Sequence, residues 1–192
     1  MLESVNKKIK KLRKKKKMTL MELGTLTDFT KGYLSRIENS PVSPRLPTLQ
    51  KIAHALEVDI GYFFEEPSDH KAETSGENHN LDLMRGTINT NQEMIESEAA
   101  YSYHPLVHNF SGKYMAPYLL RVEKGETERF THDSEEMFFV VKGRVFFYYN
   151  GKEHNMAAGD CAYFDSRLEH QICNAKDETA VLLNVVYDYK RF

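Results

Sequence analysis

The hydrophobic pattern of this chain changes its period part-way along the sequence. In residues 1–66 the apolar positions recur every three or four residues, the spacing of one face of an α-helix. From residue 85 onward they form short runs rich in β-branched and aromatic residues. The segment between, 67–84, is polar and has no aromatic residue. The pattern predicts an all-α domain at 1–66, a linker at 67–84 and an all-β domain at 85–192.

Five short helices are predicted in the first domain. Thr19, with Glu22 three residues later, has the pattern of a capping box, and Thr30 is a second N-cap candidate. Pro47 marks the start of the fourth helix, and residues 60–64 form the last one. The predicted buried positions are Val5, Ile9, Leu12, Leu20, Leu23, Leu26, Leu34, Ile37, Leu49, Ile52, Ala53 and Leu56.

Positive charge is concentrated at the start of the chain. Residues 1–66 hold 13 Lys/Arg and 8 Asp/Glu, a net charge of +5, whereas residues 67–192 hold 13 and 20, a net charge of −7. Nine of the 13 Lys/Arg residues in the first domain lie in residues 1–17. Such a cluster suits a phosphate backbone, although a solvated helix face is the alternative explanation for any single lysine.

The segment TLMELGTLTDFTKGYLSRIENS resembles the phage-repressor-like, Xre-type helix-turn-helix family, with the similarity covering about residues 6–64. In that family the third helix lies in the major groove of DNA. The resemblance implies base-edge contacts for Lys31 and Arg36 and backbone contacts for Thr30, Tyr33 and Asn39. It also implies a homodimer on double-stranded DNA. A domain of this type can instead serve as a protein–protein module, because a fold does not determine a function.

Three further positions match structural features of the same family. Arg13 and Glu38 correspond to an arginine and a glutamate that commonly pair, so both are expected to be structural. Gly24 supplies the small residue where the second and third helices cross. Asp28 stands where the family usually has glycine, and aspartate tolerates the left-handed backbone required there.

The second domain is predicted to be an all-β sandwich or barrel. Its strands are expected at 115–122, 137–141, 144–149, 161–164, 171–173 and 179–187. Asn150 and Gly151 fit a two-residue hairpin turn. The region resembles the cupin superfamily over about residues 100–188, which implies a double-stranded β-helix, or jelly-roll, barrel. The matching motif positions are Gly125, Phe130, His132, Glu136 and Gly143, then Asp165, Arg167, His170 and Asn174.

The cupin resemblance implies a metal site with one ligand missing. Phe130 stands where the first histidine of the four-ligand set belongs. His132, Glu136 and His170 remain, and two imidazoles with one carboxylate can hold Fe(II) or Zn(II) with open coordination positions. Many cupins use these positions without a metal. A divalent metal ion and a polar pocket for an organic ligand are therefore both open.

Other polar residues of the predicted strands are candidates for the ligand pocket. Arg121 would suit an anionic effector, and Tyr103 and Tyr148 are candidate lining residues, although a single Tyr or Arg in a strand also occurs as packing or surface. Glu135 should point away from the barrel interior by strand alternation.

The two domains together predict a one-component transcriptional regulator, whose cupin domain senses a small molecule or metal. The alternative is an enzyme, because a small group of proteins with this domain order resembles hydroxypropylphosphonate epoxidase, a mononuclear non-haem iron oxygenase. Arg129 departs from that group, which has asparagine there, so the regulator is favoured. No apolar run approaches the roughly 20 residues that span a membrane, and no apolar signal core follows the basic N-terminus, which predicts a cytoplasmic protein.

Overall fold

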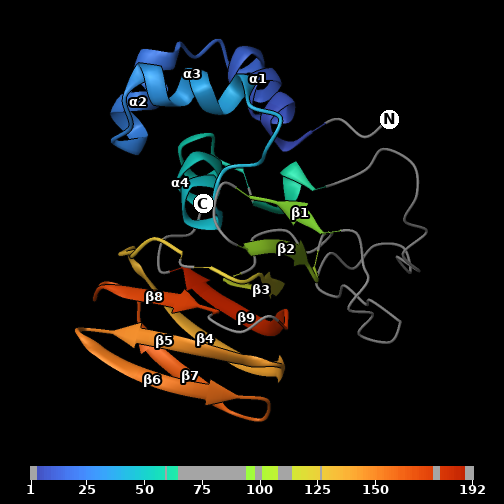
Figure 1. Ribbon diagram of the computed structural model, residues 1–192. Coiled ribbons are helices and arrows are strands. Elements are labelled where there is room, and N and C mark those ends of the chain that lie inside the picture. The colour runs from blue at the N-terminus through green and yellow to red at the C-terminus, as the bar shows by residue number, and fades with distance from the viewer. Residues whose placement is uncertain are drawn as a thin grey trace, which may run out of the picture. The chain divides into compact units, whose positions relative to one another are not determined.

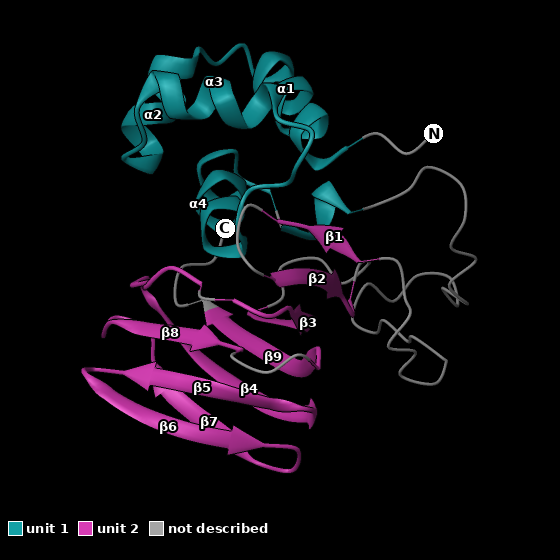
Figure 2. Cartoon of the chain, in the orientation of Figure 1, with its two compact units in different colours: residues 1–82, 108–112, 192 teal, residues 83–107, 113–191 magenta. Residues whose placement is uncertain are grey.

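The computed structural model forms two compact units, one helical and one built of strands (Figure 2). The structure describes residues 4–58, 60–64, 94–97, 101–107, 114–125, 127–174 and 178–188. The predicted linker at 67–84 lies outside the described residues. The domain boundaries at residues 66 and 85 therefore stay predictions.

Within the described residues, the helical unit consists of four α-helices and a short 3-10 helix (Figure 1). They are α1 (Val5–Lys15), α2 (Leu20–Thr27), α3 (Lys31–Asn39), α4 (Leu46–Ala55) and η1 (Ile60–Phe63). The prediction of five α-helices is wrong for the last one, which is the 3-10 helix η1. The Phe64 N–H bonds the Gly61 carbonyl three residues back, and so short a segment favours the 3-10 form. None of the described helices is long and apolar enough to cross a membrane.

Local signals determine the turn between α2 and α3. The Glu22 N–H donates to Thr19 Oγ1 and the Thr19 N–H donates to Glu22 Oε2, which completes the predicted capping box. Thr30 caps α3 by accepting a hydrogen bond from the Tyr33 N–H. Asp28 follows α2 with a φ of 59°, the left-handed conformation expected for this position.

The helices share one apolar core. Its fully buried members include Ile9, Leu23, Leu34, Ile37, Leu49, Ile52, Leu56 and Phe63. Leu26 was predicted to be buried with them but is exposed. The buried face of α2 is centred on Leu23, Gly24 and Thr27, and this orientation turns Leu26 toward solvent.

Gly24 lies where α2 meets the turn before α3. A methyl group here would lie 2.6 Å from the Phe29 carbonyl oxygen, which is backbone and cannot move aside easily. We expect Gly24→Ala to lower the free energy of unfolding by about 1–3 kcal/mol, measured by urea denaturation followed by circular dichroism. Gly32→Ala is the matched control, because a methyl group there meets nothing within 4 Å and improves helix propensity. Equal effects of the two substitutions would contradict the steric explanation.

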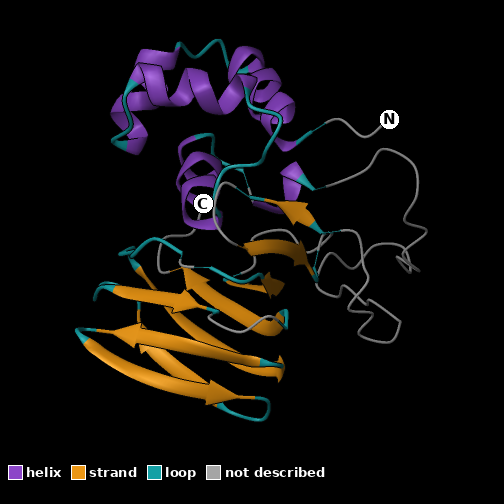
Figure 3. Cartoon of the chain, in the orientation of Figure 1, coloured by secondary structure: helices purple, strands orange, loops and turns teal. Residues whose placement is uncertain are grey.

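The strand unit contains two antiparallel sheets (Figures 1 and 3). Its strands are β1 (Ile95–Glu96), β2 (Tyr101–Pro105), β3 (Met115–Val122), β4 (Ser134–Lys142), β5 (Arg144–Tyr149), β6 (Lys152–Ala157), β7 (Cys161–Asp165), β8 (His170–Cys173) and β9 (Ala180–Asp188). The six-stranded sheet has the order β1-β2-β3-β9-β4-β7, and the three-stranded sheet has the order β6-β5-β8.

All six predicted strands are present, and β1, β2 and β6 are additional. The first four residues of β6 are exposed polar side chains, so its sequence lacks the apolar alternation that predicts a strand. Asn150 and Gly151 have φ values of 46° and 78°, which confirms the predicted two-residue turn between β5 and β6.

Aromatic side chains fill the space between the two sheets. Phe138 in β4 packs edge-on against Phe147 in β5, with ring centroids 5.0 Å apart, and Phe164 in β7 lies 4.9 Å from Phe147. Strand alternation places Glu136 on the same side of β4 as Phe138. This side is called the inner face. Glu135 lies on the opposite side, the outer face, as predicted.

Candidate functional site

Three potential metal ligands meet at the inner face. Glu136 is in β4, His170 begins β8, and His132 lies two residues before β4. Glu136 Oε1 is 2.7 Å from His132 Nε2 and 3.8 Å from His170 Nε2. One ligand atom from each residue lies within 4.8 Å of the others. The structure thus brings together the three residues that the sequence predicted as a metal-binding set.

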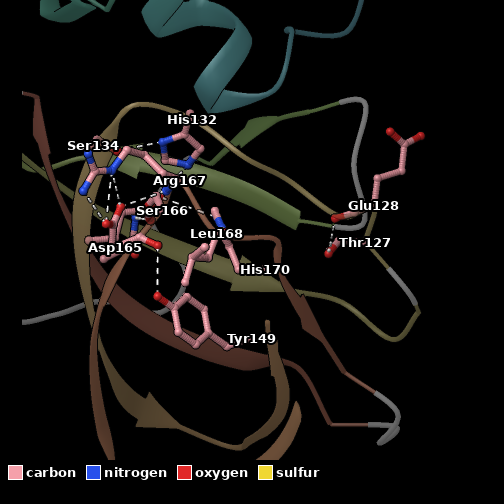
Figure 4. Close-up of polar contacts among 12 residues, drawn as sticks. Thr127, Glu128, His132, Ser134, Tyr149, Asp165, Ser166, Arg167, Leu168 and His170 are labelled. Atoms are coloured by element: carbon pink, nitrogen blue, oxygen red, sulfur yellow. Dashed lines mark hydrogen bonds and ion pairs between the residues drawn. The ribbon is translucent and has the colours of Figure 1, made fainter. Parts of the chain in front are cut away.

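The Nδ1 atom of each imidazole ring forms a hydrogen bond with another group (Figure 4). His170 Nδ1 donates to the Leu168 carbonyl oxygen at 3.0 Å, which leaves the lone pair of the neutral ring on Nε2. His132 Nδ1 is 2.7 Å from the Ser134 hydroxyl oxygen. Metal-ligating histidines are usually oriented by such a hydrogen bond. Both Nε2 atoms therefore point to the same place beside Glu136, where His132 Nε2 contacts Oε1.

Glu136 is buried and is bonded at both carboxylate oxygens. Ser166 donates to Oε1 and Asn184 donates to Oε2, each at 3.1 Å. Burial by itself raises the pKa of this carboxyl. The hydrogen bond and charge of His132, with smaller contributions from His170 and Asn184, outweigh burial and lower the pKa of Glu136. The residue is therefore a carboxylate near neutral pH, as a metal ligand must be.

His170 has the protonation state that binds a cation. Burial lowers the pKa of His170, and the opposing effects of the Leu168 carbonyl and Glu136 do not restore it. A neutral imidazole is the form that ligates a metal. Two imidazoles and one carboxylate, with the remaining positions open, suit a divalent ion such as Fe(II) or Zn(II). The residues present therefore fit such an ion.

Phe130 occupies the position of the missing fourth ligand. Its backbone forms an isolated antiparallel bridge with His170, and the centroids of the two rings are 6.1 Å apart. An apolar ring offers no ligand atom. This substitution limits the set to three residues and leaves coordination positions for a bound molecule.

Sequence reasoning missed two residues of this site, Ser166 and Asn184. Asn184 pairs with Phe138 across β9 and β4, so it lies on the inner face. Its Oδ1 atom is buried and has no hydrogen-bond partner within the described part of the chain. A buried acceptor without a donor is costly, so this position suits a bound water or ligand. Asn184 could have been noticed in the sequence as a single polar residue in an apolar strand. Ser166 follows a strand, and no sequence pattern indicated its role.

The structure places only one of the three predicted pocket residues on the inner face. Tyr103 is buried there and pairs with Leu120. Arg121 follows Leu120 in β3, so strand alternation directs it to the outer face. Tyr148 lies on the side of β5 opposite to Tyr149, whose register partner is His170. Arg121 and Tyr148 therefore lie on the outer sides of their strands, and their role in lining a ligand pocket stays a prediction.

Tyr149 lies on the inner side of β5, next to Tyr148. Its hydroxyl donates to the Asp165 carbonyl oxygen at 3.2 Å (Figure 4). Its ring packs edge-on against Phe164, with centroids 5.6 Å apart. Tyr148 instead contributes to a hollow of about 200 Å³ beside the turn that follows β5. The other lining residues of this hollow are Arg129, Gly151, Glu153, Glu169, His170 and Gln171.

The predicted DNA-contacting residues lie along the exposed side of α3. Lys31 and Arg36 are exposed. The Arg36 guanidinium lies over the Tyr33 ring, 5.1 Å from its centroid, and Tyr33 packs edge-on against Phe29 with centroids 5.1 Å apart. These ring contacts restrict the motion of Arg36 while leaving its hydrogen-bond donors at the surface.

Thr30 and Asn39 mark the two ends of α3. Thr30 is the N-cap residue, and the Asn39 amide donates to the Ser35 carbonyl oxygen at 2.7 Å. Asn39 Oδ1 accepts a hydrogen bond from Lys10 Nζ at 2.9 Å. This contact places one lysine of the basic α1 helix beside the C-terminal end of α3.

A buried ion pair connects α1 to α3. Arg13 Nε and Nη2 donate to the two carboxylate oxygens of Glu38 at 2.5 and 2.9 Å, and Nη1 donates to the Met18 carbonyl at 2.7 Å. The hydrogen bond to Glu38 raises the pKa of Arg13. The side chains are only 10% and 3% exposed, so the pair is structural, as predicted.

Comparison with known proteins identifies both units. Residues 9–63 match the helix-turn-helix family model, and residues 118–186 match the cupin domain model. The chain thus combines a helix-turn-helix domain of the Xre type with a cupin domain. It is similar to the HTH-type transcriptional regulator PuuR of Escherichia coli (strain K12), with 25% identity over 171 residues, which cover 88% of this chain and 86% of that protein.

Two further proteins are similar to this chain. The chain is 31% identical over 70 residues to the immunity repressor protein of Bacillus phage phi105, covering 36% of this chain and 49% of the repressor. A solved structure of an HTH_3 family transcriptional regulator from Vibrio cholerae has a TM-score of 0.61 and 22% identity, and the match covers 97% of this chain and 96% of that one. This last likeness shows the shared fold. The curated relatives are regulators, which supports the prediction of a regulator rather than an enzyme.

Proposed function

We propose that this protein is a cytoplasmic one-component regulator, in which the helical unit binds operator DNA as a homodimer and the cupin unit binds a divalent metal and a small-molecule effector. The observation that carries the proposal is the presence in one chain of exposed Lys31 and Arg36 on α3 and of a buried set of His132, Glu136 and His170. A DNA reader and a ligand pocket in one chain are the two parts that a sensor of this kind requires.

The exposed side of α3 supports specific recognition of DNA. A guanidinium restricted by an aromatic ring loses little entropy when it donates two hydrogen bonds to a guanine edge, and Arg36 has this arrangement. The lysines of α1 add affinity for phosphates that does not depend on sequence. Two copies are proposed because dimers of such domains span half-sites about one helical turn apart.

The inner face supports the sensing part of the proposal. His132, Glu136 and His170 would hold Fe(II) or Zn(II), which would supply a Lewis acid for oxygen or nitrogen atoms of an effector. Asn184 Oδ1 offers a buried acceptor beside Glu136. Effector occupancy would change operator affinity only if the effector binds the two functional states with different affinity, and the coupling would be reciprocal.

Arg36→Ala is expected to weaken binding to the operator by about 1–3 kcal/mol, because a bidentate contact to one base pair is lost. The operator is first obtained by selecting random duplexes on the full chain. Gel-shift titration at fixed salt then compares the two proteins on the selected duplex and on a scrambled one. The loss should be confined to the selected duplex.

Arg144→Ala is the charge-matched control, since Arg144 is an exposed arginine in the strand unit. Its effect on operator affinity should be small. If no duplex is enriched, or if Arg36→Ala binds the selected duplex as wild type does, the DNA-reading role of α3 is wrong.

A further inference from the structure

The hollow beside the turn between β5 and β6 lies on the outer side of the three-stranded sheet. One row of the register supplies three of its lining residues, because Gln171 in β8, Tyr148 in β5 and Glu153 in β6 are cross-strand partners. His170 also borders the hollow, but its Nε2 atom is 3.8 Å from Glu136 Oε1 on the inner face. The volume of about 200 Å³ has room for about seven water molecules, and therefore for one small molecule.

Glu153 brings an uncompensated negative charge to this hollow. The other charged lining residues, Arg129 and Glu169, neutralise one another, with Arg129 Nη1 2.8 Å from Glu169 Oε2. Among the described residues, none forms a hydrogen bond or ion pair with the Glu153 carboxylate. With His170 neutral, one positive and two negative side chains leave a net charge of −1. The hollow therefore favours a cation.

Gln171 offers the hollow a hydrogen-bond acceptor. This residue is only 9% exposed, and its Nε2 atom donates to the Thr127 carbonyl oxygen. Because a carbonyl can only accept, this bond determines which end of the amide is the NH2 group. The other end, Oε1, accepts no hydrogen bond from the part of the chain that the structure describes. An acceptor in a side chain this buried is stabilised by a donor that a ligand brings.

Tyr148 lies between these two acceptors. It pairs with Gln171 on one side and with Glu153 on the other, so the acceptors are two interstrand spacings apart, about 10 Å. One metal ion cannot span this distance, because its ligand atoms lie within about 2.6 Å of it. A flat molecule that covers the tyrosine ring can span it, and an aromatic face also attracts a positive charge.

We propose that this hollow binds a small, flat organic cation. Its positive end pairs with the Glu153 carboxylate, its planar body covers the ring of Tyr148, and its far end donates a hydrogen bond to Gln171 Oε1. Amidines and guanidines attached to a ring that carries an N–H or O–H group at the opposite end belong to this class. An anion is a poor occupant, because the Arg129 guanidinium already pairs with Glu169.

The hollow is separate from the proposed operator and metal sites, so the test uses the full chain without DNA or added metal. The probe is 4-aminobenzamidine, and 4-aminobenzamide and 4-aminobenzoate are its neutral and anionic counterparts of nearly the same shape. A failure of operator selection or of Zn(II) uptake would leave this test intact. The proposals can therefore fail independently.

Two-dimensional amide NMR should show saturable shifts of the Gly151 backbone amide and the Gln171 side-chain amide when 4-aminobenzamidine is added, since both residues line the hollow. A Kd of about 0.2–6 mM is expected for a ligand of about ten non-hydrogen atoms. The neutral amide should bind about tenfold more weakly, and the benzoate should cause no saturable shift. Benzamidine, which lacks the amino group that would reach Gln171, should bind at least about threefold more weakly.

Three variants locate the binding. Glu153→Gln should weaken 4-aminobenzamidine about tenfold and remove its advantage over the amide. Glu178→Gln is the matched control, because Glu178 is an exposed carboxylate of the same unit, and it should bind the probe as wild type does. Glu136→Gln changes the inner face and should also leave probe affinity unchanged.

Three results would overturn the proposal. One is the absence of saturable shifts up to about 20 mM probe, well above the expected Kd. Another is equal affinity of Glu153→Gln and wild type for the amidine. The third is loss of probe binding in Glu136→Gln, which would place the cation at the inner face. Equal binding of benzamidine and 4-aminobenzamidine would overturn the contact to Gln171.

Discussion

Glu38→Gln is expected to lower the free energy of unfolding of the helical unit by about 3 kcal/mol, a large effect for one substitution. Glutamine has nearly the shape of glutamate but lacks its charge. The Arg13 guanidinium now bonds both oxygens of Glu38 in a buried position; in the variant it would keep its bond to Met18 and one bond to the amide oxygen, and its other donor would face the amide NH2 group. A buried cation without its anion accounts for the loss. Urea unfolding of the full chain, followed by helical circular dichroism, measures it.

Two comparisons isolate the charge of this pair. Arg13→Met combined with Glu38→Leu should recover most of the stability, because two packed apolar side chains leave no unpaired charge. Glu57→Gln removes the anion from the exposed pair with Lys16, where the two atoms are 2.8 Å apart, and should change stability little. A midpoint for Glu38→Gln no lower than that for Glu57→Gln would contradict the conclusion that the charge of Glu38 stabilises the buried Arg13.

Glu136→Gln is expected to weaken Zn(II) binding by more than about 100-fold, beyond the 10–100-fold typical of changes in the surrounding shell. The substitution removes the one carboxylate from a set that otherwise holds two imidazoles, so the attraction for the cation falls sharply. Competition with a chromophoric chelator measures the affinity, and elemental analysis of the purified wild type gives the number of ions per chain.

Neighbouring residues supply the controls for this experiment. Glu135→Gln changes the adjacent carboxylate, which lies on the outer face, and should leave Zn(II) affinity near that of the wild type. Asn184→Leu removes the hydrogen bond to Glu136 Oε2 and should weaken binding by about 10–100-fold. A wild-type protein that takes up neither Zn(II) nor Fe(II) would exclude the metal and leave a pocket for an organic effector.

The helix-turn-helix was predictable because its signals act over a few residues. The capping box of Thr19 and Glu22, the N-cap at Thr30 and the left-handed Asp28 each involve neighbours within four positions. The exposure of Leu26 was not predictable in this way, because it depends on which side of α2 meets the other helices. The sequence period alone allowed either orientation.

The strand unit shows why the side on which each pocket candidate lies could not be predicted from the sequence. Strand β5 reads Arg-Val-Phe-Phe-Tyr-Tyr and is apolar or aromatic on both sides, so its sequence does not reveal which residues face inward. A shift of one position exchanges Tyr148 for Tyr149. In the same way, a shift of one position along β3 would exchange Leu120, on the inner face, for Arg121, on the outer face.

The sequence by itself determined the domain order, the helix caps and the three residues His132, Glu136 and His170, because these depend on local backbone preferences and on motif spacing. Only the tertiary structure decided the surroundings of Glu136. Asn184, 48 residues away along the chain, reaches its carboxylate because strand register and alternation place it on the inner face. Ser166, 30 residues away, follows β7 and is held there by the hydrogen bond from its N–H to the Ser134 carbonyl. Register is set by the packing of whole sheets, so residues far apart in sequence meet for reasons that no short segment contains.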